Sequence, residues 1–327
     1  MKTLIRFLTF SAALAIAWLA YFAYTPIQLK METVDFDIEA GSRFRIISKQ
    51  LVAQKVLAEP LSFELLARVL GQASDLKAGI YIIKNGTTPI DLLTQITSGT
   101  TGQAGVTFIE GWTFAQMRQA LNQNEAIKHM TMSETDAQIL KQIGANETQA
   151  EGLFFPDTYY FAPNTSDREI LKRAYITMQG KINKAWAEKS EGLPYQTPYQ
   201  ALIMASIVEK ETGKASERPQ IAGVFINRLK VGMRLQTDPT VIYGLGEHFD
   251  GNLHKKDLLT DTAYNTYTRD GLPPTPIAMP GLGAIHAALH PAPTKALYFV
   301  GKGDGSHAFS ASLSEHNNAV VRYQLGG

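Results

Sequence analysis

The sequence predicts an α+β protein with an apolar N-terminal helix, a small module and a larger domain. Three observations support this organisation. Residues 7–29 carry no charge, residues 34–104 show the order strand, helix, helix, strand, and residues 105–325 mix short strand patterns with helical ones. The length of 327 residues agrees with this division, because a globular domain averages about 150 residues.

The uncharged run at the N-terminus has the composition of a transmembrane helix. At about 1.5 Å of rise per residue, residues 7–29 are long enough to cross a hydrocarbon core of about 30 Å. Lys2 and Arg6 precede the run, so the positive-inside rule predicts residues 1–6 in the cytoplasm and the chain after Lys30 outside it. A cleaved signal peptide is the alternative, but the small-x-small triplets lie inside the run and apolar sequence follows them. We therefore expect a single-pass membrane anchor.

The small module is predicted from alternating and helical patterns over residues 34–104. Its expected elements are a strand at 34–38, helices at 46–57 and 61–70, and a strand at 79–83. A further helix is expected to begin at Pro89, with Thr88 as its N-cap, because proline fits the first helical position. The stretch 98–102 is rich in Ser, Gly and Thr and predicts the end of the module.

The helix predicted at residues 198–212 carries two glutamates on different faces. Thr197 can cap it, and Gly213 follows its end. At 100° per residue, Glu211 falls on a stripe with Met204, Ile207 and Val208. Glu209 points nearly opposite, beside Leu202, Ala205 and Ser206, which predicts a buried and hydrogen-bonded structural carboxylate. A carboxyl group beside an apolar stripe loses hydration, which raises its pKa, so Glu211 is a candidate general acid unless it faces solvent in the last turn.

Three other segments are candidates for recognition. The aromatic run 151–161 either fills a core or stacks on sugar rings, and a core is the commoner outcome. The runs 234–241 and 264–267 are expected to be loops or strand ends. Their acid, amide and phenol groups suit the recognition of hydroxyl and acetamido groups, or else they cap turns.

Composition excludes several classes of chemistry. There are 31 Lys and Arg against 30 Asp and Glu, so the chain lacks the basic surplus of a nucleic-acid-binding protein. It has no cysteine, which excludes disulfides, thiolate nucleophiles and cysteine-bound metals. The seven histidines show no ligand spacing, so we expect no metal and no cofactor. G-x-S-x-G is also absent, which leaves carboxylate chemistry.

Five stretches together resemble the YceG-like family of endolytic murein (peptidoglycan) transglycosylases. They are EGLFFPDTYYF (151–161), ASIVEKETG (205–213), ERPQIAGVFINRLKVGMRLQTDPTVIYGLG (217–246), AYNTYTRDGLPPTPIAMPG (263–281) and HPAPTKALYFVGKGDGSHAFSASLSEHN (290–317). The resemblance implies an α+β catalytic domain over 105–325 and a LysM-like subdomain over 34–104.

The resemblance also implies a mechanism that needs one carboxyl group. In this family the essential acid is the second glutamate of the E-K-E-T run, which is Glu211 here. Lytic transglycosylases let the muramic acid C6 hydroxyl attack its own anomeric carbon, so one group can protonate the leaving oxygen and then accept the hydroxyl proton. Transition-state stabilisation needs polar neighbours. The residues nominated for that role are Gln236, Asp238, Tyr264, Asn265 and Tyr267.

The implied function is cleavage of the MurNAc-β-1,4-GlcNAc bond inside nascent glycan strands, giving 1,6-anhydroMurNAc ends and terminating elongation. The implied location is the inner membrane, with a single span and a periplasmic catalytic domain, and the implied partners are glycan strands and penicillin-binding synthases. Two alternatives remain open. One is a water-using muramidase with Asp238 or Glu151 as its second carboxylate. The other is a non-catalytic glycan-binding scaffold.

Overall fold

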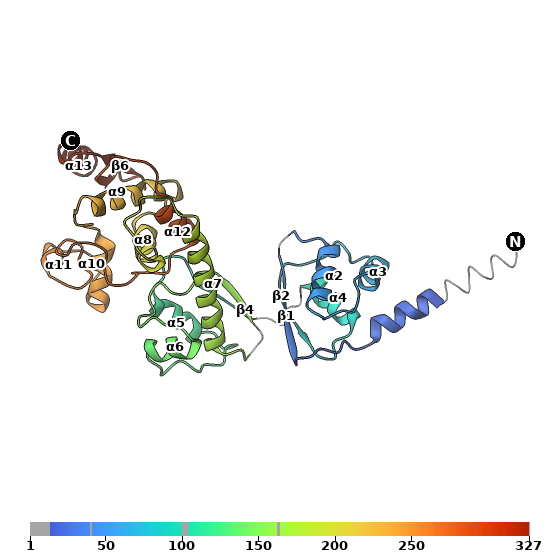
Figure 1. The fold of residues 1–327 in the computed structure, drawn as a ribbon. Coiled ribbons are helices and arrows are strands. Elements are labelled where there is room, and N and C mark those ends of the chain that lie inside the picture. Colours follow the sequence, from blue (N-terminus) through green and yellow to red (C-terminus); the bar gives the residue numbers. More distant parts are fainter. Residues whose placement is uncertain (1–13, 40, 100–103, 162–163, 327) are drawn as a thin grey trace. The chain divides into compact units, whose positions relative to one another are not determined.

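The computed structural model describes residues 14–39, 41–99, 104–161 and 164–326. The chain divides into two compact units (Figure 1). Unit 1 comprises residues 1–105 and 160–164, and unit 2 comprises residues 106–159 and 165–327. Helices and three two-stranded sheets make up the described part, which confirms the predicted α+β class.

Unit 1 has the predicted order of strand, helix, helix, strand and a further helix. These elements are β1 (Thr33–Ile38), α2 (Phe44–Ala53), α3 (Leu61–Val69), β2 (Gly79–Lys84) and α4 (Pro89–Ser98). β1 and β2 pair antiparallel, with Thr33 opposite Lys84. Thr88 caps α4, because its side chain accepts a hydrogen bond from the Asp91 N–H, and Pro89 occupies the first turn as predicted.

The apolar N-terminal run is helical at residues 14–24 in the described part, and residues 7–13 of the expected anchor lie outside it. The helix was expected to continue to residue 29 but ends ahead of Pro26, because a proline disfavours helical geometry at the residue before it. After the helix, Ile27 packs in the core of unit 1, where its N–H donates to the Thr87 carbonyl at 2.9 Å and its side chain is buried. No helix in the described residues is long and apolar enough to cross a membrane.

Unit 2 is mostly helical. Its helices are α5 (Phe114–Asn122), α6 (Asp136–Ile143), α7 (Asp167–Ala187), α8 (Pro198–Glu211), α9 (Arg218–Lys230), α10 (Asp238–Leu245), α11 (Lys255–Leu259), α12 (Leu282–Leu289) and α13 (Leu313–Gln324), with short 3-10 turns at Ala215–Glu217 and Gly246–His248. β5 (Tyr298–Gly301) and β6 (His307–Ser310) form an antiparallel hairpin. β3 (Ala104–Thr107) pairs with β4 (Thr158–Phe161), and the division between the two units falls within these two strands. α12 packs on α8, α9 and α7, so α8 is enclosed on several sides (Figure 1).

Residues 151–159 of the aromatic run lie in unit 2 and are mostly buried, whereas Tyr160, which is assigned to unit 1, is 44% exposed. Phe154 is fully buried, and its ring stacks on Phe114 with 4.8 Å between the centroids. Tyr159 is 5% exposed, and Phe155 is 8% exposed. The core interpretation of these aromatics is therefore confirmed.

α10 corrects one sequence expectation. The run 234–241 was expected to be a loop or a strand end, yet a helix begins at Asp238 inside it. Pro239 lies in the first turn, where a backbone N–H has no partner within the helix, so the helix loses no hydrogen bond. The negative charge of Asp238 also suits the N-terminus of a helix. The helix begins in the middle of the polar run, which hides it from a search for apolar periodicity.

Candidate active site

The C-terminal end of α8 places two carboxylates on different faces of the unit. Thr197 caps the helix by accepting a hydrogen bond from the Gln200 N–H at 3.3 Å, and Pro198 occupies the first position. Eight consecutive residues, Ala201 to Val208, are buried, so the helix is held on all sides before it reaches the glutamates. Glu209 and Glu211 then diverge, because residues two apart on a helix do not face each other.

Glu209 is a structural carboxylate. Its Oε1 accepts a hydrogen bond from Arg218 Nη2 at 2.9 Å, and its Oε2 accepts one from the Gly281 N–H at 2.9 Å. The side chain is 5% exposed. This confirms the expectation of a buried, hydrogen-bonded group that joins α8 to α9 and to the loop before α12.

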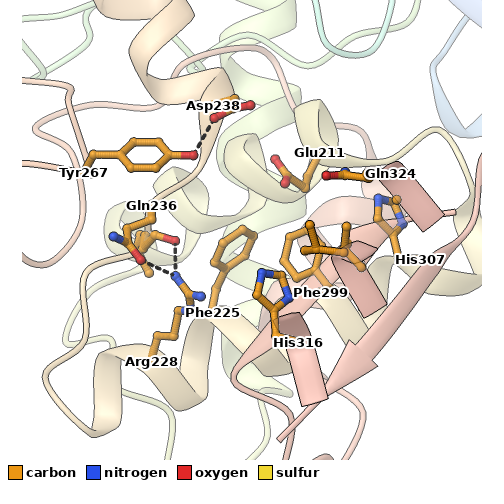
Figure 2. A pocket seen from close by; sticks show the side chains of 14 residues that line it. Glu211, Phe225, Arg228, Gln236, Asp238, Tyr267, Phe299, His307, His316 and Gln324 are labelled. Atoms are coloured by element: carbon orange, nitrogen blue, oxygen red, sulfur yellow. Dashed lines mark hydrogen bonds between the residues drawn. The ribbon is translucent and has the colours of Figure 1, made fainter. Parts of the chain in front are cut away.

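Glu211 lines a cavity of about 310 Å³ that opens to solvent. Asp238 and Tyr267 lie to one side of Glu211, and His307 lies to the other (Figure 2). The wall is built from α8, α9, α10, the β5–β6 hairpin, α13 and two loops. The lining residues are Glu211, Phe225, Arg228, Leu235, Gln236, Asp238, Tyr267, Phe299, Val300, Gly301, His307, His316, Val320 and Gln324.

The surroundings of Glu211 fit a group that both gives and takes a proton. Its pKa is raised to about 7, mainly by burial, and the nearby charge of Asp238 contributes to the rise. The hydrogen bond from Thr237 Oγ1 to Glu211 Oε2, at 2.9 Å, and the charge of Arg228 act in the opposite direction. A carboxyl group with a pKa near neutrality is populated in both protonation states, which general acid and base catalysis require.

Arg228 is a buried arginine that the sequence reasoning missed. Its Nε donates to the Leu297 carbonyl at 2.6 Å, and its Nη1 donates to the Leu235 carbonyl at 2.9 Å and to Gln236 Oε1 at 3.3 Å (Figure 2). It therefore fixes the loop before α10 against the loop before β5. The signal in the sequence was a charged residue inside the mainly apolar run of α9, where the neighbouring Phe225 is also buried.

Three of the five nominated polar residues line the Glu211 cavity. They are Gln236, Asp238 and Tyr267. Tyr267 donates a hydrogen bond from its hydroxyl to Asp238 Oδ1 at 2.5 Å, which orients that carboxylate at the cavity wall. Gln236 has a left-handed backbone, with φ of 50°, which turns the chain sharply ahead of α10.

The other two nominated residues lie outside that cavity. Asn265 is fully buried, and its Nδ2 donates to the carbonyls of Asp257, Leu258 and Thr260 at the end of α11. Tyr264 shares a hydrogen bond of 2.9 Å with the Thr275 hydroxyl and lines a different cavity. The structure therefore gives Asn265 a role in holding the loop.

Asn265→Ala should lower the free energy of unfolding by about 2 kcal/mol, because buried carbonyls lose their donor. Urea unfolding of the variant and the wild type measures this. The KM for a glycan substrate should change little once the fraction of folded protein is matched. A large rise in KM with unchanged stability would instead make Asn265 a substrate contact.

Glu151, one of the two candidate second carboxylates, occupies a separate cavity of about 940 Å³. Its Oε1 accepts a hydrogen bond from the Phe114 N–H at 3.0 Å, and its Oε2 accepts one from the Tyr243 hydroxyl at 3.1 Å. Burial raises its pKa to about 7. Of the two candidates, only Asp238 lines the cavity of Glu211.

The raised pKa of Glu151 makes stability depend on pH. In the folded state Glu151 holds its proton up to about pH 7, whereas in the unfolded chain it loses the proton near pH 4.3. The contribution of this proton to stability is therefore complete below about pH 4.3 and is lost as pH rises from there through 7. Glu151→Gln carries no titrating group. Its stability relative to wild type should rise by about 1–3 kcal/mol between pH 5 and pH 8. Urea unfolding at both pH values tests this, and a difference that stays constant would contradict it.

Comparisons with known proteins agree with these features. A model of the YceG-like family matches residues 36–322. A Bacillus subtilis (strain 168) protein named endolytic murein transglycosylase is 34% identical over 309 residues, covering 89% of this chain and 85% of the relative. A protein of the same name from Streptococcus pneumoniae serotype 2 is 27% identical, covering 98% of this chain and 64% of the relative.

A solved structure supports the same assignment. The crystal structure of a YceG-like protein from Listeria monocytogenes matches with a TM-score of 0.56 and 31% identity. The match covers 88% of this chain and 99% of that chain. With the family model spanning both units, the chain belongs to the YceG-like family.

Proposed function

We propose that this protein is an endolytic murein transglycosylase, a lyase that cleaves peptidoglycan glycan strands. The observation that carries the proposal is the Glu211 carboxyl group, which lines an open cavity and has a pKa of about 7. The name of the relative that is 34% identical supports the same reaction. The catalytic residue is Glu211, and Gln236, Asp238 and Tyr267 are the polar groups that face the reacting sugar.

The reaction proceeds through one proton donor that is regenerated. Thr237 binds Glu211 Oε2, so Oε1 handles the proton. Protonated Glu211 gives its proton to the glycosidic oxygen as the bond from that oxygen to the muramic anomeric carbon breaks. The C6 hydroxyl of the same sugar then forms the new bond to that carbon and gives its proton back to Glu211. We assign to Asp238, which Tyr267 orients, the stabilisation of positive charge in the oxocarbenium-like transition state.

Mass spectrometry of the products tests this reaction against a water-using muramidase. The proposed reaction leaves 1,6-anhydro ends, which are lighter by one water than reducing ends. Every new end formed at a cleaved bond of a purified glycan strand should be an anhydro end, and fragments should come from inside the strand. New reducing ends would instead identify hydrolysis, with Asp238 as the second carboxylate.

The proposal extends to where the enzyme acts. The apolar run 7–29 would anchor the chain in the inner membrane, with the catalytic unit in the periplasm, close to nascent strands and the penicillin-binding synthases. The strand, helix, helix, strand order and the antiparallel β1–β2 pair support a LysM-like, glycan-binding role for unit 1. Replacing the anchor by a cleavable signal peptide separates location from chemistry, because the released enzyme should lose control of strand length in cells while it keeps its activity in solution.

A further inference from the structure

The cavity that contains Glu151 is large enough to hold a ligand of its own. Its volume of about 940 Å³ lies at the upper end of the range of about 300–1,000 Å³ that is typical of small-molecule sites. Its walls come from the beginnings of α5 and α6, the loop 149–151, the end of α8, one face of α10 and the segment 246–249, all within unit 2. The reaction proposed for Glu211 leaves this cavity unused.

The lining of this cavity combines aromatic faces with carboxylates. Tyr243 and Tyr264 pack edge to face with 4.8 Å between their centroids, and Phe249 contributes a third ring. The acidic groups of the wall are Asp136, Glu151 and Glu247, of which Asp136 is paired with Arg118 at 3.1 Å outside the lining. The only basic group among the lining residues is Lys210, whose Nζ donates to the Gly111 carbonyl at 3.3 Å.

Glu151 is the lining residue that is best suited to bind a cation. It is 8% exposed, and the donors to its carboxyl group, which are the Phe114 N–H, the Gly152 N–H and the Tyr243 hydroxyl, carry no charge. The ionised form of this buried group is costly without a cationic partner, and an ammonium group beside it would remove part of that cost and favour ionisation. An ammonium group also binds to the faces of aromatic rings. Rings and carboxylates together therefore select a primary amine over an anion or a neutral polar group.

The two cavities meet at consecutive residues of the chain. At the end of α8, Lys210 lines the Glu151 cavity and Glu211 lines the other. At the start of α10, Pro239 lines the Glu151 cavity and Asp238 lines the other. Consecutive Cα atoms are 3.8 Å apart. The two cavities therefore lie on either side of the same stretches of backbone, and a branch of a sugar polymer bound at Glu211 would pass around these stretches to reach the second cavity.

We infer that the Glu151 cavity binds the amine-bearing peptide branch of the same glycan strand whose sugar backbone occupies the Glu211 cavity. This rests on the proposed function, since murein strands carry short peptides that contain a diamino acid. The amine of that residue is a free ammonium group until the peptide accepts a cross-link, when the amine becomes an amide. The enzyme would therefore favour strands whose peptides have not accepted a cross-link.

A binding measurement on the whole chain with Glu211→Gln tests this inference without cleavage. The probes are a muramyl peptide with lysine as its third residue, the same compound acetylated on the lysine amine, and the sugar without a peptide. Calorimetry should give a Kd about tenfold lower for the free amine than for the acetylated probe. Adding Glu247→Gln or Phe249→Leu, both on the open side of the cavity, should reduce this ratio to about threefold or less. Glu191→Gln, an exposed residue outside the cavity, is the matched control and should leave the ratio unchanged.

Three results would overturn the inference. Equal affinities for the free and the acetylated amine would remove amine recognition altogether. A preference that survives both cavity variants would place the amine at another site. If the cavity variants weakened binding of the sugar without a peptide as much as binding of the amine probe, the cavity would be a sugar subsite. Cleavage assays with the wild type separate this inference from the proposed function, because failure to cleave any strand refutes the lyase, whereas the ratio of affinities decides the amine site by itself.

Discussion

Glu211→Gln is expected to lower the rate of glycan cleavage by about 10²–10⁴-fold while glycan binding is retained, because general acid–base catalysis contributes an effect of that size. The amide keeps the shape of the carboxyl group and can still accept the hydrogen bond from Thr237. It has no proton to give to the leaving oxygen. Release of anhydro products, quantified by mass spectrometry, and a separate binding assay with the same strands measure the two effects.

The pH profile of the wild-type enzyme tests the same assignment of Glu211 independently. Since the acid must begin the cycle protonated, the rate should fall as pH rises through about 7, where Glu211 loses its proton. Glu191→Gln, on an exposed loop, serves as the matched control and should keep the wild-type rate and profile. Cleavage by Glu211→Gln at the wild-type rate would remove Glu211 from the mechanism.

Arg228→Met should be the most destabilising of the single changes considered, with a loss of about 3–5 kcal/mol in the free energy of unfolding. The methionine fills much of the space but donates no hydrogen bond. The carbonyls of Leu235 and Leu297 then remain buried without the donor that serves them in the wild type. Urea unfolding at neutral pH measures the change, and loss of the fixed loop before α10 should also impair catalysis.

Arg234→Met is the matched control for this prediction. Arg234 pairs with Asp270 at 2.9 Å, but the two side chains are 47% and 75% exposed. An ion pair at the surface contributes about 0–1 kcal/mol, so the control should unfold nearly as the wild type does. Equal losses for the two variants would show that the buried contacts of Arg228 do not stabilise the fold.

Local patterns predicted the parts of the structure that depend on one helix or one turn. The opposite directions of Glu209 and Glu211 follow from 100° per residue, and the start of α4 follows from the chemistry of Thr88 and Pro89. The α10 helix was missed because its first residues belong to a polar run. The early end of the N-terminal helix was signalled by Pro26, which interrupts an otherwise continuous apolar run.

The active-site residues were harder to predict because the cavity is assembled from distant segments. Arg228 acts on Leu297, which is 69 positions away, and no sequence pattern encodes that contact. Tyr264 and Tyr267 lie in one short loop with similar chemistry, yet they line different cavities. The hydroxyl of Tyr264 binds the Thr275 hydroxyl, whereas the hydroxyl of Tyr267 binds Asp238, so each ring is directed by its own tertiary partner. Residue type identified the loop, and tertiary contacts decided which side chains reach the acid.

The wall shared by the two cavities of unit 2 also bears on inhibitor design. A positively charged sugar mimic at Glu211 and a primary amine near Tyr243 could be parts of one compound, because the walls of both cavities meet at Lys210 and Glu211. Joining two weak fragments by a tether that matches the span raises the effective concentration of the second to about the millimolar range. A compound that occupies both cavities would therefore bind more tightly than either fragment alone. A single substitution in one cavity would restore only part of the activity of the inhibited enzyme.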